Sequence, residues 1–202
     1  MFETQDPEAG RIHERGLARR PAPGGVERCS ARALGIAISA VLLGCGTGRT
    51  AKRAGDAATS FYATKLRLHV DGLPTEAQQS TLSPLISTRL DSLLRAARDY
   101  QTRYEREHPG DKPPFVEGDL FSSLFEGPAR FEITGIARDG AGFRVHVRFE
   151  ADTGGPPPFR WTDDAIVKQE GARMVLDDVE LGGGWAFATK GKLSEILKSR
   201  GG

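Results

Sequence analysis

The chain has 202 residues, of which 28 are Lys or Arg and 27 are Asp or Glu, giving a formal net charge of +1. This balance argues against the concentrated basic face that nucleic-acid binding requires, so no nucleic acid is expected as a partner. The first 44 residues hold six basic and five acidic residues, and the remainder is formally neutral and long enough for one domain with a sizeable core.

An apolar run, Ala33 to Cys45, is the first informative stretch. It reads ALGIAISAVLLGC, follows the cationic residues Arg28 and Arg32, and is too short to cross a bilayer of about 30 Å as a helix. A positive flank, a short apolar core and small residues at its end are typical of a secretory signal peptide. The closing Leu-Leu-Gly-Cys resembles the lipobox of bacterial lipoproteins. This resemblance implies that Cys45 is lipidated, for example with palmitate, and becomes the mature N-terminus.

The region before the apolar run is unusually long for a signal peptide. Residues 1–25 are rich in Arg, Gly and Pro and have no apolar period, so disorder is expected there. The length favours the hypothesis that translation starts at Val26 rather than at Met1. An intact-mass measurement of the uncleaved precursor would distinguish the two starts.

Three parts of the chain are therefore expected: a disordered leader with a lipoprotein signal peptide over 1–44, a tether over 45–54, and a single domain over 55–202. Gly46, rather than Asp, follows the lipidated Cys45. In lipoproteins of diderm bacteria this implies an address in the cell envelope, at the outer membrane and facing the periplasm.

The same stretch allows a second interpretation. VLLGCGTG, from Val41 to Gly48, looks like the first motif of methyltransferases that use S-adenosylmethionine, in which a strand leads into a glycine-rich turn. That fold needs strands that alternate with helices further along the chain. The sequence after Pro109 instead predicts antiparallel hairpins, so the methyltransferase is the less favoured alternative.

Two helices are expected at the start of the domain. The first begins at Asp56 as N-cap, ends at Asp71-Gly72, and carries an apolar residue every fourth position. These apolar residues are Ala58, Tyr62, Leu66 and Val70. The second begins at Ser83, with Pro84 in its first turn, and ends at Pro109-Gly110. Its apolar stripe consists of Ile86, Leu90, Leu93, Leu94, Ala97, Tyr100 and Tyr104.

The loop DKPPFVEGDLFSSLFEGP, residues 111–128, is rich in proline and also strongly apolar. A loop of this composition is expected to fold back onto the core, with Asp119 capping a single turn. The alternative is a lip over a pocket or partner site, in which Asp119 and Glu126 supply the polar groups.

The period of the sequence then changes to two. RFEITGIARDGAGFRVHVRFEAD predicts a hairpin that turns at Asp139 to Gly142. Two further strands are expected at Phe159 to Lys168 and Arg173 to Leu181, and a last helix at Lys192 to Ser199. The expected fold class is α+β, with N-terminal helices packed on a curved four-stranded antiparallel sheet and a closing C-terminal helix.

Several short segments together resemble a known family. They are the helix with Phe61 and Tyr62, the segment GDLFSSLFEGP, the tripeptide Trp161-Thr162-Asp163, and VLDDV near the end. With the lipobox, they are similar to a family of uncharacterised bacterial envelope lipoproteins, whose domain resembles the cone-shaped fold of nuclear transport factor 2 and ketosteroid isomerase. The resemblance implies a fold and an envelope location but no particular activity, because this fold hosts enzymes, binders and assembly modules.

Isomerases of this fold use a carboxylate as proton acceptor and a phenol as hydrogen-bond donor. Residues of those types here are Tyr62, Tyr100, Asp119 and Asp163. The expected pocket or partner lip consists of Tyr62, Asp119, Phe121, Phe125, Glu126, Trp161 and Asp163. No His or Cys set has ligand spacing, so no metal and no cofactor are expected.

The sequence thus predicts a non-catalytic envelope protein that is held at the membrane by a lipid. It would bind a protein partner or a small ligand through its cone or its sheet face. A pocket enzyme of the isomerase-like fold is the alternative. Whether Tyr62, Asp119 and Asp163 converge on one cavity distinguishes the two.

Overall fold

The computed structural model describes residues 44–201 except 153, 155 and 156. The leader and the apolar run up to Leu43 lie outside the described residues, and so does the alternative start at Val26. Cys45, the expected lipidation site, belongs to the described backbone, but its side chain lies outside the described part.

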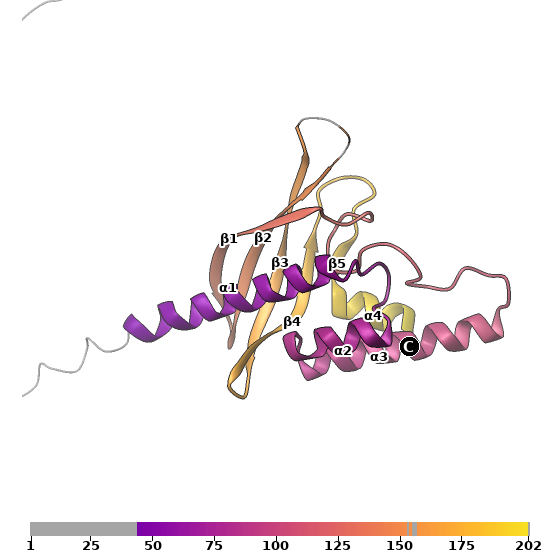
Figure 1. Ribbon diagram of the computed structural model, residues 1–202, viewed down its shortest axis with the longest axis horizontal. Helices are drawn as coiled ribbons and strands as arrows, with labels where there is room; N and C mark the ends of the chain where they lie inside the picture. Colours follow the sequence, from indigo (N-terminus) through magenta and orange to yellow (C-terminus); the bar gives the residue numbers. More distant parts are fainter. Residues whose placement is uncertain (1–43, 153, 155–156, 202) are drawn as a thin grey trace, which may run out of the picture. The chain divides into compact units, whose positions relative to one another are not determined.

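The described part combines four α-helices with one antiparallel sheet (Figure 1). The helices are α1 (Gly44–Arg67), α2 (Glu76–Leu82), α3 (Thr88–Glu107) and α4 (Leu193–Gly201), with a short 3₁₀ helix η1 (Ser83–Leu85) before α3. The strands are β1 (Arg130–Asp139), β2 (Gly142–Ala151), β3 (Phe159–Glu170), β4 (Arg173–Gly182) and β5 (Lys190–Lys192). The order in the sheet follows the order in the chain, and every neighbouring pair is antiparallel.

The expected α+β class and antiparallel sheet are confirmed, but the sheet has five strands instead of four. The additional strand β5 is only three residues long, and all three are exposed. A Lys-Gly-Lys segment has no alternation of apolar and polar residues, so no sequence pattern marks it as a strand. Its lysines lie at the edge of the sheet, where charged residues discourage pairing with another chain.

The first helix begins twelve residues before Asp56, the expected N-cap, so residues 45–54, the expected tether, are helical and form its first turns. Asp56 pairs with Lys52 one turn earlier instead of capping the helix. Ala54 and Ala58 are buried in the core and Ala51 packs against it, so packing extends the helix backwards even though Gly46 and Gly48 are poor helix formers. The methyltransferase motif would need a tight turn at Gly44 to Gly48 and a parallel sheet downstream, whereas these residues are helical and every neighbouring strand pair in the described part is antiparallel.

The second expected helix is divided in two. Thr75 caps α2 in a capping box, and Pro84 lies in η1. Ser87, not Ser83, caps α3, and its hydroxyl accepts a hydrogen bond from the amide of Leu90 at 3.0 Å. The Ser83 hydroxyl points elsewhere, because it donates to the carboxylate of Asp91 at 2.7 Å.

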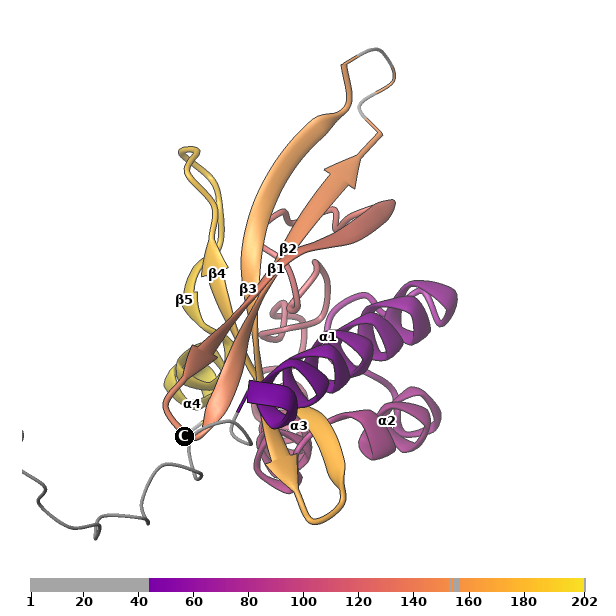
Figure 2. The same cartoon turned by 90° about the vertical axis from the view of Figure 1, so that its left-hand side faces the viewer.

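The core lies between α1 and the concave face of the sheet, and α4 packs against α3 and β4 (Figure 2). The expected alternation in the hairpin is confirmed, since four residues of β2 are buried on the helix side: Phe143, Val145, Val147 and Phe149. The opposite face carries ion pairs. Arg144 binds both Asp164 and Glu180, at 2.8 and 2.7 Å.

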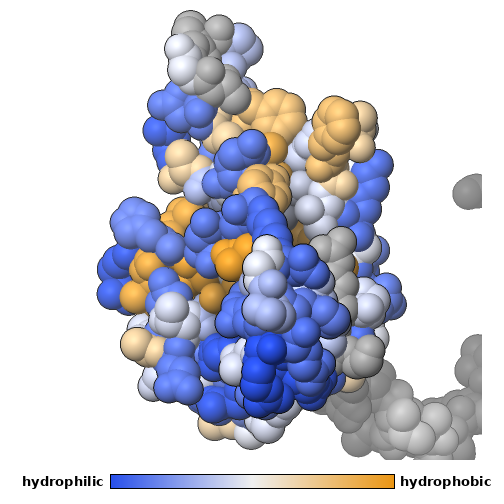
Figure 3. All heavy atoms as spheres, turned by 90° about the vertical axis from the view of Figure 1, so that its right-hand side faces the viewer, coloured by the Kyte–Doolittle hydropathy of each residue, from blue (hydrophilic) through white to orange (hydrophobic). Residues whose placement is uncertain are grey.

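Hydrophobic residues reach the surface mainly on one part of the face in Figure 3. Four large apolar side chains in the described part are exposed: Val116, Phe125, Ile136 and Phe187. Phe187 is 94% exposed in the loop between β4 and β5. Trp185 of the same loop instead packs edge-on against Phe159, with ring centroids 5.0 Å apart.

Candidate functional site

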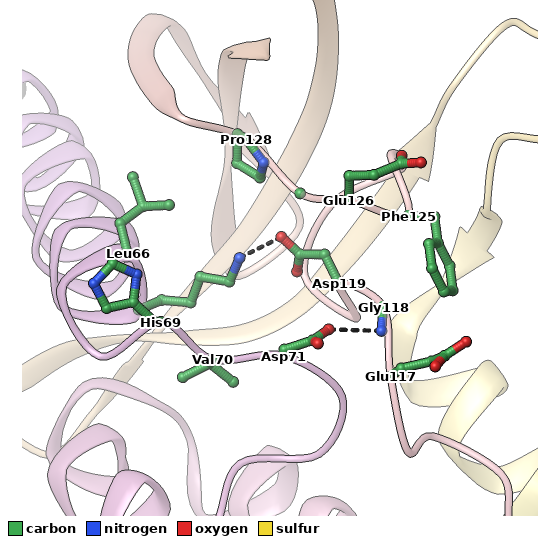
Figure 4. A pocket seen from close by; sticks show the side chains of 12 residues that line it. Leu66, His69, Val70, Asp71, Glu117, Gly118, Asp119, Phe125, Glu126 and Pro128 are labelled. Carbon is green, nitrogen blue, oxygen red and sulfur yellow. Dashed lines mark hydrogen bonds and ion pairs between the residues drawn. The ribbon is translucent and has the colours of Figure 1, made fainter. Parts of the chain in front are cut away.

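A pocket of about 490 Å³ opens between the last turns of α1 and the segment 117–128 (Figure 4). It is called the Lys65 pocket here. Its lining is Lys65, Leu66, His69, Val70, Asp71, Glu117, Gly118, Asp119, Phe125, Glu126, Gly127 and Pro128.

A second hollow of about 450 Å³ lies on the other side of the same segment, next to β5 and α4. The two hollows share Glu117, Gly118, Asp119 and Phe125. The ring of Phe125 lies directly over Gly118, because a Cβ built on that glycine would be 2.4 Å from the ring. Phe125 is 51% exposed, so one of the four residues between the two hollows is a half-exposed ring.

The polar floor of the Lys65 pocket is an ion pair between α1 and the loop. The ammonium of Lys65 binds the Oδ2 atom of Asp119, and the two side chains are only 6% and 4% exposed. The other oxygen of Asp119 accepts a hydrogen bond from the amide of Phe121 at 2.8 Å. The amide of Asp119 donates to the carbonyl of Phe125, also at 2.8 Å. The loop is therefore closed on itself around the carboxylate that faces Lys65.

Burial is the largest influence on Asp119 and raises the pKa of its carboxyl, although Lys65 opposes this effect. Behind the pocket, burial also raises the pKa of Tyr62 far above its usual value, with further contributions from Asp163 and Asp119. The pocket floor is thus a poorly solvated environment in which a charge depends on its protein partners.

The rim of the pocket is mostly acidic. Asp71 accepts a hydrogen bond from the amide of Gly118 at 2.6 Å, and Glu117 is paired with Lys112. Glu126 is exposed. His69 follows the end of α1 with a φ of 49°, a left-handed conformation that ends the helix and places the histidine on the rim.

The structure separates the residues expected to form one lip. Asp119, Phe125 and Glu126 line the Lys65 pocket, whereas Tyr62, Phe121, Trp161 and Asp163 are buried in the core and do not line it. The hydroxyl of Tyr62 donates a long hydrogen bond of 3.4 Å to the carbonyl of Phe121. Tyr62, Asp119 and Asp163 therefore do not converge on one cavity in the described part of the chain.

Asp163 fastens the loop to the sheet. Its carboxylate accepts hydrogen bonds from the amide of Ser123 at 2.7 Å, the amide of Gly182 at 2.8 Å and the indole of Trp161 at 3.0 Å. The Ser123 hydroxyl also donates to it. All its acceptor capacity is directed at the protein, so Asp163 supports the position of the loop that carries Asp119.

Three polar lining residues from α1 and its end, Lys65, His69 and Asp71, were not among those expected. For Lys65 a signal did exist. It lies four residues after Phe61 and seven after Ala58, on the stripe that α1 buries, whereas Leu66 is only half-buried. A lysine at a core position of an amphipathic helix indicates a buried partner of opposite charge.

Among the described residues, no group of three or more His, Cys, Asp and Glu side chains is arranged to hold a metal ion. The helices of the same part include none with the length and apolar character needed to cross a membrane.

Comparison of the chain with protein-family models, with curated proteins and with solved structures found no significant match. A functional assignment therefore rests on the geometry of the Lys65 pocket and on the apolar run that ends at Cys45.

Proposed function

We propose that the protein is an envelope lipoprotein, anchored at Cys45, whose domain binds a small polar ligand in the Lys65 pocket. The proposal includes an outer-membrane address facing the periplasm, which follows from Gly46 after the anchored cysteine. It also includes a relationship to the cone-shaped fold of nuclear transport factor 2, for which a helix-covered curved antiparallel sheet is the supporting feature.

The buried ion pair of Lys65 and Asp119 is the observation that supports ligand binding in the pocket. Removing two charges from water is costly, and a buried ion pair often contributes less to stability than apolar residues of the same size. A pair that lines a cavity has a use beyond stability, since it offers a ligand a carboxylate acceptor and an ammonium donor in a poorly solvated site. Leu66, Val70 and Pro128 supply apolar walls around it.

The ligand class follows from this floor. A ligand that carries a hydrogen-bond donor and an acceptor side by side, such as an amide or a zwitterion, can bind Asp119 and Lys65 together. The acidic rim of Asp71, Glu117 and Glu126 favours a ligand that has no net negative charge.

A thermal-shift screen of the full chain with amides, amino acids and amines tests the pocket. A ligand present at about 100 times its Kd stabilises the folded state by about 2.7 kcal/mol. The gain should be absent in a Lys65→Met/Asp119→Asn double variant and retained in Tyr62→Phe, which changes a side chain outside the pocket. Equal gains in all three proteins would show that the ligand binds elsewhere.

Labelling with radioactive palmitate tests the anchor separately. The wild-type chain should incorporate label and Cys45→Ala should not. Equal incorporation by both chains would refute lipidation at Cys45.

A pocket enzyme is the second candidate, and one observation favours it. Asp119 lines a cavity and has a raised pKa, so it is suited to exchange a proton with a bound molecule. Incubating a ligand found in the screen with the protein, followed by mass spectrometry, decides the matter. An enzyme would return a changed ligand that Asp119→Asn leaves intact, and a binder would return the ligand unchanged.

A further inference from the structure

We propose that the basic end of the domain, defined by Arg49, Lys52, Arg53 and Arg173, lies against the phosphate headgroups of the membrane that holds the anchor. This inference rests on the proposed anchor at Cys45 and adds the surface that faces the membrane. It also assigns the chemistry of that contact, which is between guanidinium or ammonium groups and anionic lipid.

The geometry of α1 places this end near the anchor. The backbone is helical from Gly44 onward, so no flexible tether separates Cys45 from the domain. At 1.5 Å per residue, Arg53 is about 12 Å along the helix axis from Cys45. The polar headgroup layer on each side of a bilayer is about 5–8 Å thick. A basic side chain in the second or third turn therefore reaches that layer.

The basic residues of α1 share one side of the helix. Arg49, Lys52 and Arg53 are spaced three and four residues apart and are all exposed, and Ala54 and Ala58 bury the opposite side. The cluster therefore lies on the exposed side of α1, outside the core.

The turn between β3 and β4 adds the fourth cation. The guanidinium of Arg53 donates to the carbonyl of Ala172 at 2.6 Å, and the neighbouring Arg173 donates to the carbonyl of Pro84 at 3.0 Å. Arg53 and Arg173 also line one shallow hollow of about 320 Å³, whose apolar lining includes Leu85 and Met174. The cluster is thus held in place by contacts between α1, η1 and β4.

Few acidic groups offset these charges. In the described part of the chain, the ion pairs include neither Arg53 nor Arg173, whose described bonds go to uncharged carbonyls. Asp56 neutralises Lys52, and Glu170 near the turn is bound to Thr88 and Lys168. A net positive surface at the anchored end is what an anionic leaflet attracts.

The orientation also suits the pocket. Lys65 is twelve residues further along α1 than Arg53, so the Lys65 pocket lies at the end of the helix remote from the anchor. Arg173 and Gly182 are the two ends of β4, and Figure 2 shows the β3–β4 turn at the opposite end of the sheet from the loop that leads to β5. Lying on its basic end, the domain turns its pocket away from the membrane.

Vesicle sedimentation of the mature chain, residues 45–202 carrying Cys45→Ala, tests the contact without the anchor and without the cationic, apolar leader. Vesicles of phosphatidylcholine alone are compared with vesicles that also contain phosphatidylglycerol. We expect stronger binding to the anionic vesicles, weakened by salt, and an additional loss of about tenfold or more in Arg53→Gln/Arg173→Gln, since each basic residue near an anionic surface contributes about 1 kcal/mol. The matched control is Lys190→Gln/Lys192→Gln, which removes the same charge from exposed β5 and should keep the preference.

Arg53 and Arg173 also make structural contacts, so a second variant protects the test against misfolding. Arg49→Gln/Lys52→Gln changes exposed side chains of α1 and should reduce anionic binding in the same direction. Unchanged binding in both variants, or an equal loss in the β5 control, would overturn the proposal. Displacement by inorganic phosphate but not by sodium chloride of equal ionic strength would also overturn it, because the site would then bind free phosphate.

The palmitate experiment distinguishes this inference from the function on which it rests. If Cys45 is labelled but the protein does not bind anionic vesicles more strongly than neutral ones, only the proposed membrane-facing surface is wrong. If Cys45 is not labelled, the anchor is wrong whatever the vesicles show.

Discussion

Lys65 in α1 and Asp119 in the loop before β1 form an ion pair that is almost completely withdrawn from water. Residues 54 positions apart are thereby joined at the floor of one pocket. This pair connects α1 to the loop that covers the core, so both the stability of the domain and the floor of the Lys65 pocket depend on it.

Lys65→Met should destabilise the domain by about 3–5 kcal/mol, because it leaves a buried carboxylate without a cation. The additional change Asp119→Asn should recover most of that loss, since the amide oxygen still accepts from Phe121 and no buried charge remains. Denaturant unfolding of the four proteins of this double-mutant cycle measures the coupling. The loss in Lys65→Met should shrink at acidic pH, where Asp119 becomes protonated. A loss independent of pH, or a double variant as unstable as the single one, would contradict the assignment.

The acid stability of the domain should depend on Asp177. Burial alone would raise the pKa of this carboxyl, but hydrogen bonds from Arg89, Ser87 and Lys168 outweigh burial and lower the pKa from its ordinary 3.8 to about 2. Between these values the unfolded chain binds more protons than the folded one, so stability is lost as the pH falls from about 4 to about 2.

The shift corresponds to about 2 kcal/mol at 1.36 kcal/mol per pH unit, and solvent screening at this half-buried group reduces the contribution of Asp177 to about 1–2 kcal/mol. Asp177→Asn should be less stable than the wild type at neutral pH, and the difference should vanish at about pH 2. Urea unfolding across this range checks the prediction, and parallel pH profiles for the two proteins would count against it.

Gly72 should tolerate substitution less well than Gly110. Both have positive φ angles, of 65° and 96°, but a Cβ on Gly72 would lie 2.4 Å from the carbonyl oxygen of Phe115, whereas Gly110 has open space. Gly110→Ala should therefore cost about 1–2 kcal/mol from backbone conformation alone. Gly72→Ala should cost about 3 kcal/mol or more, because it also pushes the loop away from α1. Similar melting temperatures for the two variants would disprove the close contact.

Asp163 and Asp164 are adjacent in β3 but face opposite sides of the sheet. Asp163→Ala leaves the buried donors of Ser123 and Trp161 and the partly buried amide of Gly182 without an acceptor, and should cost about 3–5 kcal/mol. Asp164→Ala removes partners of Arg144 and His146 on the solvent side and should cost about 1 kcal/mol or less. Tryptophan fluorescence in urea measures both, and the reverse ranking would invert the assignment of the two faces.

Four of the five strands could be predicted from the sequence, because β2 and β3 alternate, as Phe143 to Phe149 do, and because the β1–β2 and β3–β4 turns contain glycine. The early start of α1 could not be predicted from the sequence, because its first turns contain small and charged residues without an apolar stripe. Packing of Ala51, Ala54 and Ala58 against the core, rather than a local sequence signal, accounts for the early start of the helix.

The candidate site was predicted only in part, for a similar reason. Asp119, Phe125 and Glu126 belong to one contiguous loop, and its apolar composition indicated its importance. Lys65 and Asp71 come from elsewhere in the chain, and only the docking of α1 brings them to the same place. Tyr62 and Asp163 are a phenol and a carboxylate, the types of group that act in isomerases of the cone-shaped fold. In this chain their hydrogen bonds instead hold the loop against the core.

The strictly sequential order of the five strands affects how the domain forms. Each strand pairs with its immediate predecessor, so the sheet can grow as successive hairpins with short loop closures and low contact order. The docking of α1 on β1 and the parallel bridge from Ile86 to Leu176 instead join distant parts of the chain. We therefore expect the hairpins to assemble early and the helix layer to close late, so the Lys65 pocket would be among the last features to form.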